Sequence, residues 1–281
     1  MFTFSLISGI SEKIVQDEFF GILNTPLEVG ENFHALRQIF SFLDYTTLEG
    51  SDTNTKVKSL CEKAIEFGEK GLPFPAAVCI YPPFIATAKK ALQGTPIKVA
   101  TTAAAFPSGQ MVLPVKLNEI DYCVQEGADE VDVVISRGIF LDQQYDTILY
   151  ELTAMRAHCQ QQTLKVILET GELHTSENIA CASEIAIMAG ADFIKTSTGK
   201  ISPAATVEAV YVMLQVIRQY YLKTGKKIGV KPAGGIAEPE QALKYYLIVN
   251  KILGEHWLTP SLFRIGASRL ADRLSAVLLS T

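Results

Sequence analysis

The run Gly-Ala-Asp-Phe-Ile-Lys-Thr-Ser-Thr-Gly, residues 190–199, joins the end of a helix to a short strand and a loop. Its first glycine suits the left-handed conformation that ends a helix, and an apolar strand-like pair follows directly after the aspartate. A Gly-Ala-Asp joint recurs at 127–129, before Glu-Val-Asp-Val-Val at 130–134. A helix followed at once by a short buried strand is typical of alternating β and α units, which build a parallel sheet.

Outward from this joint, strand-like runs alternate with helix-like stretches along nearly the whole chain. We expect eight strands, at 39–43, 77–81, 97–101, 130–135, 164–169, 193–196, 228–231 and 262–265. Amphipathic periodicity predicts helices at 56–69, 117–125, 145–161, 176–188, 203–223 and 238–252. Thr175 is expected to cap the helix at 176–188, and Ser202 followed by Pro203 predicts the start of the next helix.

Eight β-then-α units close most simply as a (β/α)8 TIM barrel, the α/β fold that we expect for the catalytic domain at 39–281. An open doubly wound sheet is the alternative. It is disfavoured because no Gly-x-Gly-x-x-Gly follows the first predicted strand. Residues 1–38 are expected to form a short N-terminal helical extension, packed across the N-terminal face of the barrel or against a partner subunit.

Composition narrows the classes of function. The 281 residues carry a formal net charge of -5, which argues against a nucleic-acid partner. No apolar run approaches the ~18 residues that span a bilayer, so no membrane partner is expected. The five cysteines form no Cys-x-x-Cys pair, which suits reduced thiols in the cytoplasm. The four histidines have no metal-ligand spacing, so we predict no metal site.

Three charged residues sit within predicted buried strands. Period-two alternation places the side chains of Asp132, Lys195 and Lys231 inside the barrel. Neighbouring strands lie about 4.8 Å apart, so the two lysines are close enough for each charge to disfavour protonation of the other. One neutral amine can then attack a carbonyl, and Asp132 can move protons. A buried ion pair that merely holds the barrel is the alternative, but one carboxylate does not need two lysines.

Other polar groups stand on the predicted strands or where they end. Active sites of TIM barrels lie at the carboxyl ends of the strands. Asp44 and Thr47 at the first strand, Cys79 on the second and Lys165 on the fifth are therefore candidates for substrate binding.

Small-residue loops follow the last three predicted strands. These are Thr198-Gly199-Lys200, Gly234-Gly235, and Gly266 with Ser268. Backbone N–H groups in such loops bind phosphate, and the loops after strands seven and eight are a frequent phosphate site in this architecture. Three adjacent loops together predict an anionic substrate.

Four motifs carry a family resemblance. The runs at 130–134, 165–173, 192–200 and 229–236 resemble deoxyribose-phosphate aldolases, and the runs at 44–48, 78–82 and 263–268 fit the same family in the same order. The pair Lys-Thr-Ser-Thr-Gly and Lys-Pro-Ala-Gly-Gly is highly specific. The resemblance covers roughly residues 40–270.

The resemblance implies a class I aldolase without a cofactor. It would reversibly cleave 2-deoxy-D-ribose 5-phosphate to D-glyceraldehyde 3-phosphate and acetaldehyde, and would act in deoxyribonucleotide catabolism, with a homodimer as the expected assembly. Lys195 would form the Schiff base, Lys231 would depress the pKa of Lys195, and Asp132 would shuttle protons with a bound water. Lys165 would belong to the surrounding polar network. The residues alone do not decide which lysine is the nucleophile.

The chain departs from the family pattern at the expected phosphate site. Ala237 and Glu238 stand where the resemblance leads us to expect a basic residue, and Arg269 stands where a second serine often follows. We expect Arg269 to supply the lost charge. Three other functions compete: a Schiff-base, phosphate-binding barrel aldolase with a different aldehyde substrate, an inactive binding protein, and a metal-dependent aldolase. The last two are disfavoured by the retained lysines and by the lack of a ligand cluster.

Overall fold

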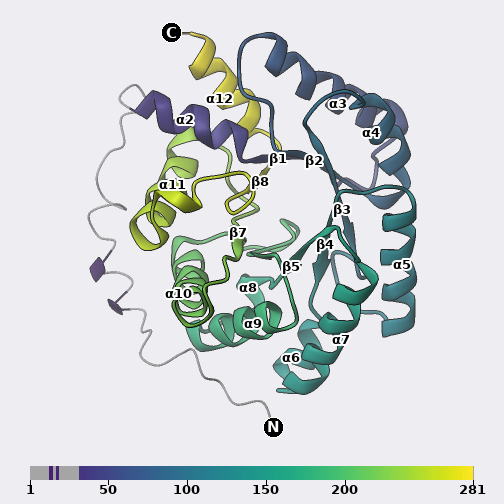
Figure 1. Ribbon diagram of the computed structural model, residues 1–281, viewed down its shortest axis with the longest axis vertical. Helices are drawn as coiled ribbons and strands as arrows, with labels where there is room; N and C mark the ends of the chain where they lie inside the picture. Colours follow the sequence, from purple (N-terminus) through teal and green to yellow (C-terminus); the bar gives the residue numbers. More distant parts are fainter. Residues whose placement is uncertain (1–12, 15–16, 19–31, 281) are drawn as a thin grey trace.

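The computed structural model describes residues 13–14, 17–18 and 32–280. Eight parallel strands lie side by side in the order β7-β6-β5-β4-β3-β2-β1-β8. Two isolated bridges, Val230 with Phe263 and Ala233 with Gly266, join the two ends of this sheet. Figure 1 shows the strands at the centre and the helices in a ring around them. The predicted (β/α)8 barrel is confirmed.

The strands are three to six residues long. They are β1 (Leu43–Thr46), β2 (Ala77–Ile80), β3 (Lys98–Ala103), β4 (Glu130–Val134), β5 (Thr163–Ile167), β6 (Phe193–Lys195), β7 (Gly229–Lys231) and β8 (Ile265–Ala267). Six of the predicted strands, β2 to β7, are confirmed to within two residues at each end.

The first and last predicted strands were misplaced. Residues 39–41 belong to the helix α2 (Phe33–Ser41), because Leu36, Ile39 and Phe40 lie three or four residues apart and form one buried helical face. At the other end, the Phe263 amide donates a hydrogen bond to the carbonyl of Thr259, which closes a turn, so the strand begins only at residue 265. Residues 266 and 267, predicted as a loop, are therefore strand.

Ten α-helices follow β1 in the described chain. They are α3 (Asn54–Glu69), α4 (Ile85–Ala91), α5 (Leu113–Gln125), α6 (Arg137–Leu141), α7 (Tyr145–His158), α8 (Thr170–Leu173), α9 (Ser176–Met188), α10 (Val207–Thr224), α11 (Pro239–Leu253) and α12 (Leu270–Leu279). Six of them correspond to the predicted helices, and α4, α6, α8 and α12 were not predicted. The cap on α9 is confirmed, since the Thr175 side chain accepts a hydrogen bond from the amide of Asn178. The predicted start of α10 at Ser202-Pro203 is wrong. Thr206 caps that helix instead, accepting from the amide of Ala209.

The helix before β1 packs on the outside of the barrel. Figure 1 shows α2 beside α11 and α12, and the Tyr246 hydroxyl donates to the Gln38 side chain at 2.5 Å. Glu18 also touches this side, since its side chain accepts from the Tyr211 hydroxyl at 2.7 Å. Most of the remaining predicted N-terminal extension lies outside the described residues.

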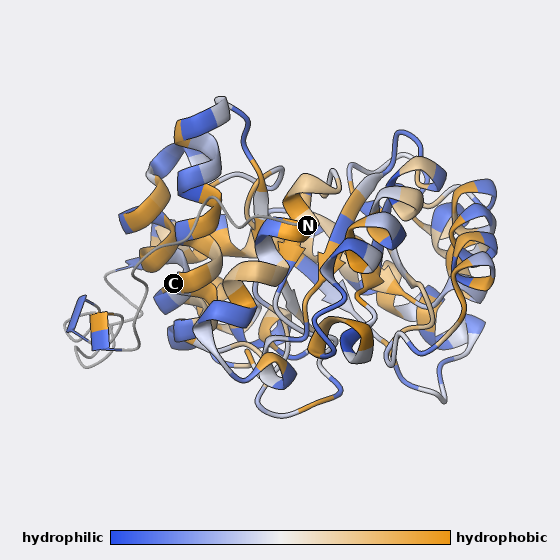
Figure 2. Ribbon diagram, turned by 90° about the horizontal axis from the view of Figure 1, so that it is seen from below, coloured by the Kyte–Doolittle hydropathy of each residue, from blue (hydrophilic) through white to orange (hydrophobic). Residues whose placement is uncertain are grey.

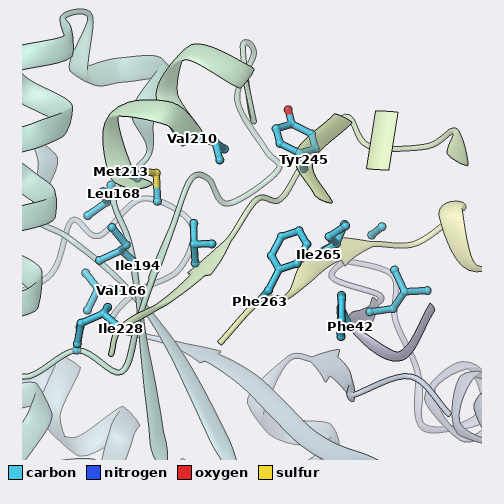
Figure 3. Close-up of a cluster of buried hydrophobic side chains, with 14 of the residues drawn as sticks. Phe42, Val166, Leu168, Ile194, Val210, Met213, Ile228, Tyr245, Phe263 and Ile265 are labelled. Carbon is cyan, nitrogen blue, oxygen red and sulfur yellow. The ribbon is translucent and has the colours of Figure 1, made fainter. Parts of the chain in front are cut away.

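The apolar core lies between the strands and the helices. Figure 3 shows this layer near β5 to β8, where Val166 and Ile194 of the strands meet Val210 and Met213 of α10. Figure 2 shows polar and apolar residues on the same outer helices, as amphipathic helices require. In the part of the chain that the structure describes, no helix is long and apolar enough to cross a membrane. With the outward positions apolar, the alternate positions face the barrel interior.

Candidate active site

The barrel interior holds an unusual number of charges. Seven charged side chains lie there at 0 to 5 % exposure, and we call them the interior charge cluster: Asp44, Glu130, Asp132, Lys165, Lys195, Lys231 and Arg264. They come from six strands or strand ends, so the cluster spans the barrel from side to side. Buried charges at this density require mutual pairing, because desolvation penalises each of them separately.

Asp132 is the centre of the cluster. Its Oδ2 accepts hydrogen bonds from the ammonium groups of Lys195 at 2.8 Å and Lys231 at 2.7 Å, and its Oδ1 accepts from Lys165 at 2.9 Å. The strand register explains this convergence, since Lys195 lies opposite Lys231 and Asp132 lies opposite Lys165 in the parallel pairs. The three residues that alternation directed inward therefore meet at one carboxylate.

A second set of ion pairs lies next to Asp132. Lys231 also contacts Asp44, and Lys165 lies 2.6 Å from Glu130. Arg264 binds Glu130 at 2.7 Å and Asp44 at 2.6 Å. Glu130 and Arg264 are not among the site residues predicted from the sequence. Alternation could have placed both side chains inward, because Glu130 is two residues from Asp132 and Arg264 lies between Phe263 and Ile265 in the predicted strand at 262–265.

The charge count of the cluster is uneven. With every group ionised, it would hold four cations and three carboxylates. Lys165, Lys231 and Arg264 each contact two or three of the carboxylates, as far as the described residues go. Lys195 contacts one, Asp132, and shares the same oxygen with Lys231. Lys195 is therefore the amine whose protonated form is least stabilised.

The pKa shifts follow this pairing. Burial lowers the pKa of Lys195, and the charge of Lys231 lowers it further, while Asp132 acts in the opposite direction. Burial also opposes the charge of Lys231, but Asp132 and Asp44 outweigh it and hold the pKa of Lys231 above its usual value. Burial raises the pKa of Asp132, yet the surrounding lysines outweigh it and hold that pKa well below the usual range. The arrangement therefore makes Lys195 the more easily deprotonated of the two lysines.

A cavity of about 170 Å³ opens above the cluster at the carboxyl ends of the strands. Within the described chain, Lys195 is the one member of the interior charge cluster that lines it. The other lining residues include every glycine-loop residue predicted from the sequence, namely Thr198, Gly199, Lys200, Gly234, Gly235, Gly266 and Ser268. Arg269 and Ala237 lie on the same wall. Lys195, whose pKa is lowered, and the predicted anion loops thus share one cavity.

Buried contacts fix the loop after β6. Glu169, in the left-handed region at φ +57°, accepts hydrogen bonds from the Thr198 hydroxyl at 2.5 Å and amide at 3.1 Å. Arg137 binds the same carboxylate at 3.1 Å. Further along the loop, Lys200 lies 3.1 Å from Glu49. This loop is held in place by an acid that the sequence analysis did not select.

The remaining predicted substrate-binding residues do not line the cavity. Asp44 and Lys165 lie beneath it in the interior charge cluster. The Thr47 hydroxyl donates to Asp52 at 2.9 Å. Cys79 packs among buried apolar residues that include Ala77 and Ala100, and burial raises the pKa of its thiol. Among the described residues, no group of three or more His, Cys, Asp or Glu side chains is arranged to hold a metal ion.

Comparison with known proteins agrees with this geometry. Residues 39–249 match the family described as DeoC/LacD family aldolase. The chain is 46% identical over 248 residues to the deoxyribose-phosphate aldolase of Homo sapiens, covering 84% of this chain and 78% of that protein. The mouse enzyme of the same name is 45% identical, with the same coverage.

A solved structure is similar in fold. The tetrameric deoxyribose phosphate aldolase of Aeropyrum pernix superposes with a TM-score of 0.68 at 21% identity, covering 96% of this chain and 99% of that chain. At this identity the likeness supports the barrel alone, whereas the family match and the mammalian relatives extend over most of the sequence. The chain therefore belongs to the DeoC/LacD family of aldolases.

Proposed function

We propose that this protein is a class I aldolase that reversibly cleaves 2-deoxy-D-ribose 5-phosphate to D-glyceraldehyde 3-phosphate and acetaldehyde. The observation that carries the proposal is the position of Lys195, which lines the cavity. Lys195 contacts a single carboxylate, in a cluster that has one more basic group than acidic groups. A buried amine with a lowered pKa is a nucleophile toward carbonyl carbon. The proposed substrate is taken from the human and mouse relatives, which are both named deoxyribose-phosphate aldolase.

The proposed reaction begins with Lys195. Its neutral amine attacks the C1 aldehyde of the open-chain sugar, and the carbinolamine hydroxyl takes up one proton and leaves as water, which gives an iminium. The iminium accepts the electron pair of the C2–C3 bond as that bond breaks, which releases D-glyceraldehyde 3-phosphate and leaves an enamine. Protonation of the enamine at C2 and addition of water then release acetaldehyde, return the proton that was used to form the iminium and restore the neutral amine.

Asp132 is suited to move the protons of these steps. Its Oδ2 lies 2.8 Å from the Lys195 nitrogen and 2.7 Å from that of Lys231. The proton released from the 3-hydroxyl balances the one gained at C2, so a single carboxylate, acting with a water, can carry it. Lys231 keeps its own proton and keeps Lys195 unprotonated.

The phosphate is proposed to bind the glycine loops at the cavity wall. Gly234 and Gly235 have φ values of +84° and +78°, which free the backbone to approach an anion closely. Ala237 offers no charge, and Lys200 is already paired with Glu49. Among the described residues, the Arg269 side chain has no ion-pair partner and lines the cavity, so we assign the missing positive charge to it.

We also propose that the enzyme acts in the cytoplasm as a homodimer. The five cysteines are free and buried, which suits a reducing compartment. The Aeropyrum pernix relative is described as a tetramer, which supports self-association of this fold. Light scattering on the 30.7 kDa chain should give twice that mass. A monomeric mass would contradict the dimer.

Borohydride trapping tests the proposed function. Acetaldehyde and borohydride should inactivate the enzyme, and peptide mass spectrometry should locate a reduced ethyl adduct on Lys195. An adduct confined to Lys231 would overturn the role assignment, and a failure to cleave 2-deoxyribose 5-phosphate would overturn the substrate. A metal chelator should leave the cleavage rate unchanged, since the proposed steps use side chains alone.

A further inference from the structure

Two members of the interior charge cluster lie at the end of the barrel opposite the cavity. Glu130 is the first residue of β4, and Arg264 immediately precedes β8. Both line a separate hollow of about 540 Å³, together with residues at the amino-terminal ends of neighbouring strands such as Lys98 and Phe193. They are nevertheless 4 and 5 % exposed, respectively. Neither residue borders the proposed substrate cavity.

A continuous series of ion pairs connects this end of the barrel to Lys195. Arg264 binds Glu130 with two nitrogens, at 2.7 and 3.1 Å. Glu130 binds Lys165 at 2.6 Å, and Lys165 binds Asp132 at 2.9 Å. Asp132 binds Lys195 at 2.8 Å. Every link is buried, so water screens these charges weakly.

Arg264 is the source of the surplus charge. Without it, the three lysines of the cluster would face three carboxylates, and Lys195 would have a net counter-charge available. A guanidinium does not lose its proton in a protein, so the surplus must be relieved at a lysine. Lys165 and Lys231 each have more than one carboxylate contact, which leaves Lys195.

We propose that the Arg264–Glu130 pair acts as a positioning device that sets the protonation state of Lys195 from the far end of the barrel. Arg264 adds the fixed positive charge that drives the proton from Lys195, and Glu130 limits its effect. The groups that face Lys195 more directly are Asp132, Lys231 and the neutral thiol of Cys79. The inference rests on the proposed role of Lys195 as the nucleophile.

Opposite charge changes at this pair should move the pH profile in opposite directions. In Arg264→Met a cation is lost, the pKa of Lys195 rises, and the acidic limb of kcat/KM moves up by about one pH unit. In Glu130→Gln a carboxylate is lost, and the limb moves down by a similar amount. The double variant removes one charge of each sign and should return close to the wild-type profile.

A matched control separates this effect from a general change of surface charge. Lys98→Met removes a positive charge from the same hollow, but Lys98 is exposed and outside the cluster, so its profile should be unchanged. If Arg264→Met alone fails to fold, Glu130→Gln still tests the inference, because its limb should move down while Arg264 keeps its contact with Asp44. The inference would be overturned if Arg264→Met and Glu130→Gln shifted the acidic limb of kcat/KM in the same direction. It would also be overturned if neither shifted the limb further than Lys98→Met does.

Trapping on the same proteins separates this inference from the proposed function. Acetaldehyde with borohydride should label Lys195 in the wild type and in every folded variant. Labelling at Lys195 without opposite shifts of the limb refutes the role of the pair and leaves the aldolase mechanism standing. If Lys195 is not labelled in the wild type, the aldolase mechanism itself is refuted.

Discussion

Replacing Lys231 with leucine gives the sharpest prediction about the two lysines. Both ammonium nitrogens contact the same Asp132 oxygen, at 2.8 and 2.7 Å, so the two contacts together place the nitrogens no more than about 5.5 Å apart. At an effective dielectric constant of ~20, that separation corresponds to about 3 kcal/mol of repulsion. This is roughly two pKa units.

The sign of the expected shift follows from the lost charge. Without Lys231, protonated Lys195 no longer meets a neighbouring cation, and it gains a larger share of the Asp132 carboxylate. Both changes raise the pKa of Lys195. The acidic limb of kcat/KM for 2-deoxyribose 5-phosphate should therefore move up by roughly two pH units, with about 100-fold less activity at pH values below both limbs.

A pH-rate series with a charge-preserving control checks this result. Lys231→Arg keeps a cation beside Asp132, so its acidic limb should stay near that of the wild type even where kcat falls. The comparison isolates the charge of Lys231 from any part it takes in proton transfer. An unchanged limb in Lys231→Leu, in a variant that still folds and still turns over, would refute the pairing of the two lysines.

Three further predictions concern the cavity wall. Arg269→Ala should raise KM for the phosphorylated sugar by about tenfold and leave KM for 2-deoxyribose unchanged; equal effects on both would remove Arg269 from the phosphate site. Gly234→Ala should lower Tm and raise KM more than Gly235→Ala, because a Cβ at 234 would lie 2.6 Å from the Ala204 side chain while the site at 235 is open, and equal losses would contradict this. Glu169→Gln should raise KM for the phosphorylated sugar with little change in kcat, because it weakens the anchor of the loop after β6; an unchanged KM would show that the loop does not need the anchor.

Sequence patterns predicted much of the barrel and the centre of its site. Alternation in β4 separated the valines at 131 and 133 from Asp132, and the short apolar runs before Lys195 and Lys231 fixed their strands. These signals are local, because a strand of a few residues is enough to define which side chains point inward. For that reason the proximity of Asp132, Lys195 and Lys231 could be predicted from the sequence.

The misplaced elements depended on longer-range contacts. Residues 39–41 are apolar enough for a strand, but they belong to a helix that packs against α11 and α12. A short apolar run fits a buried strand and a buried helix equally well, so the local pattern does not decide between them. Alternation in the predicted strand at 262–265 turns Arg264 inward, but its partners Glu130 and Asp44 are 134 and 220 residues away, so local sequence does not show what it binds. The choice between the lysines also depends on their ion pairs, since both follow the same strand pattern.

The proposed mechanism depends on the protonation state of Lys195, and the pH dependence of its trapping measures that state most directly. The rate of reductive ethylation by acetaldehyde is followed by mass spectrometry at Lys195 and at Lys231. At Lys195 it should rise with pH through a midpoint below the ordinary lysine value of 10.5, with Lys231 unlabelled. A midpoint near 10.5 at Lys195, or faster labelling of Lys231, would contradict the proposed mechanism.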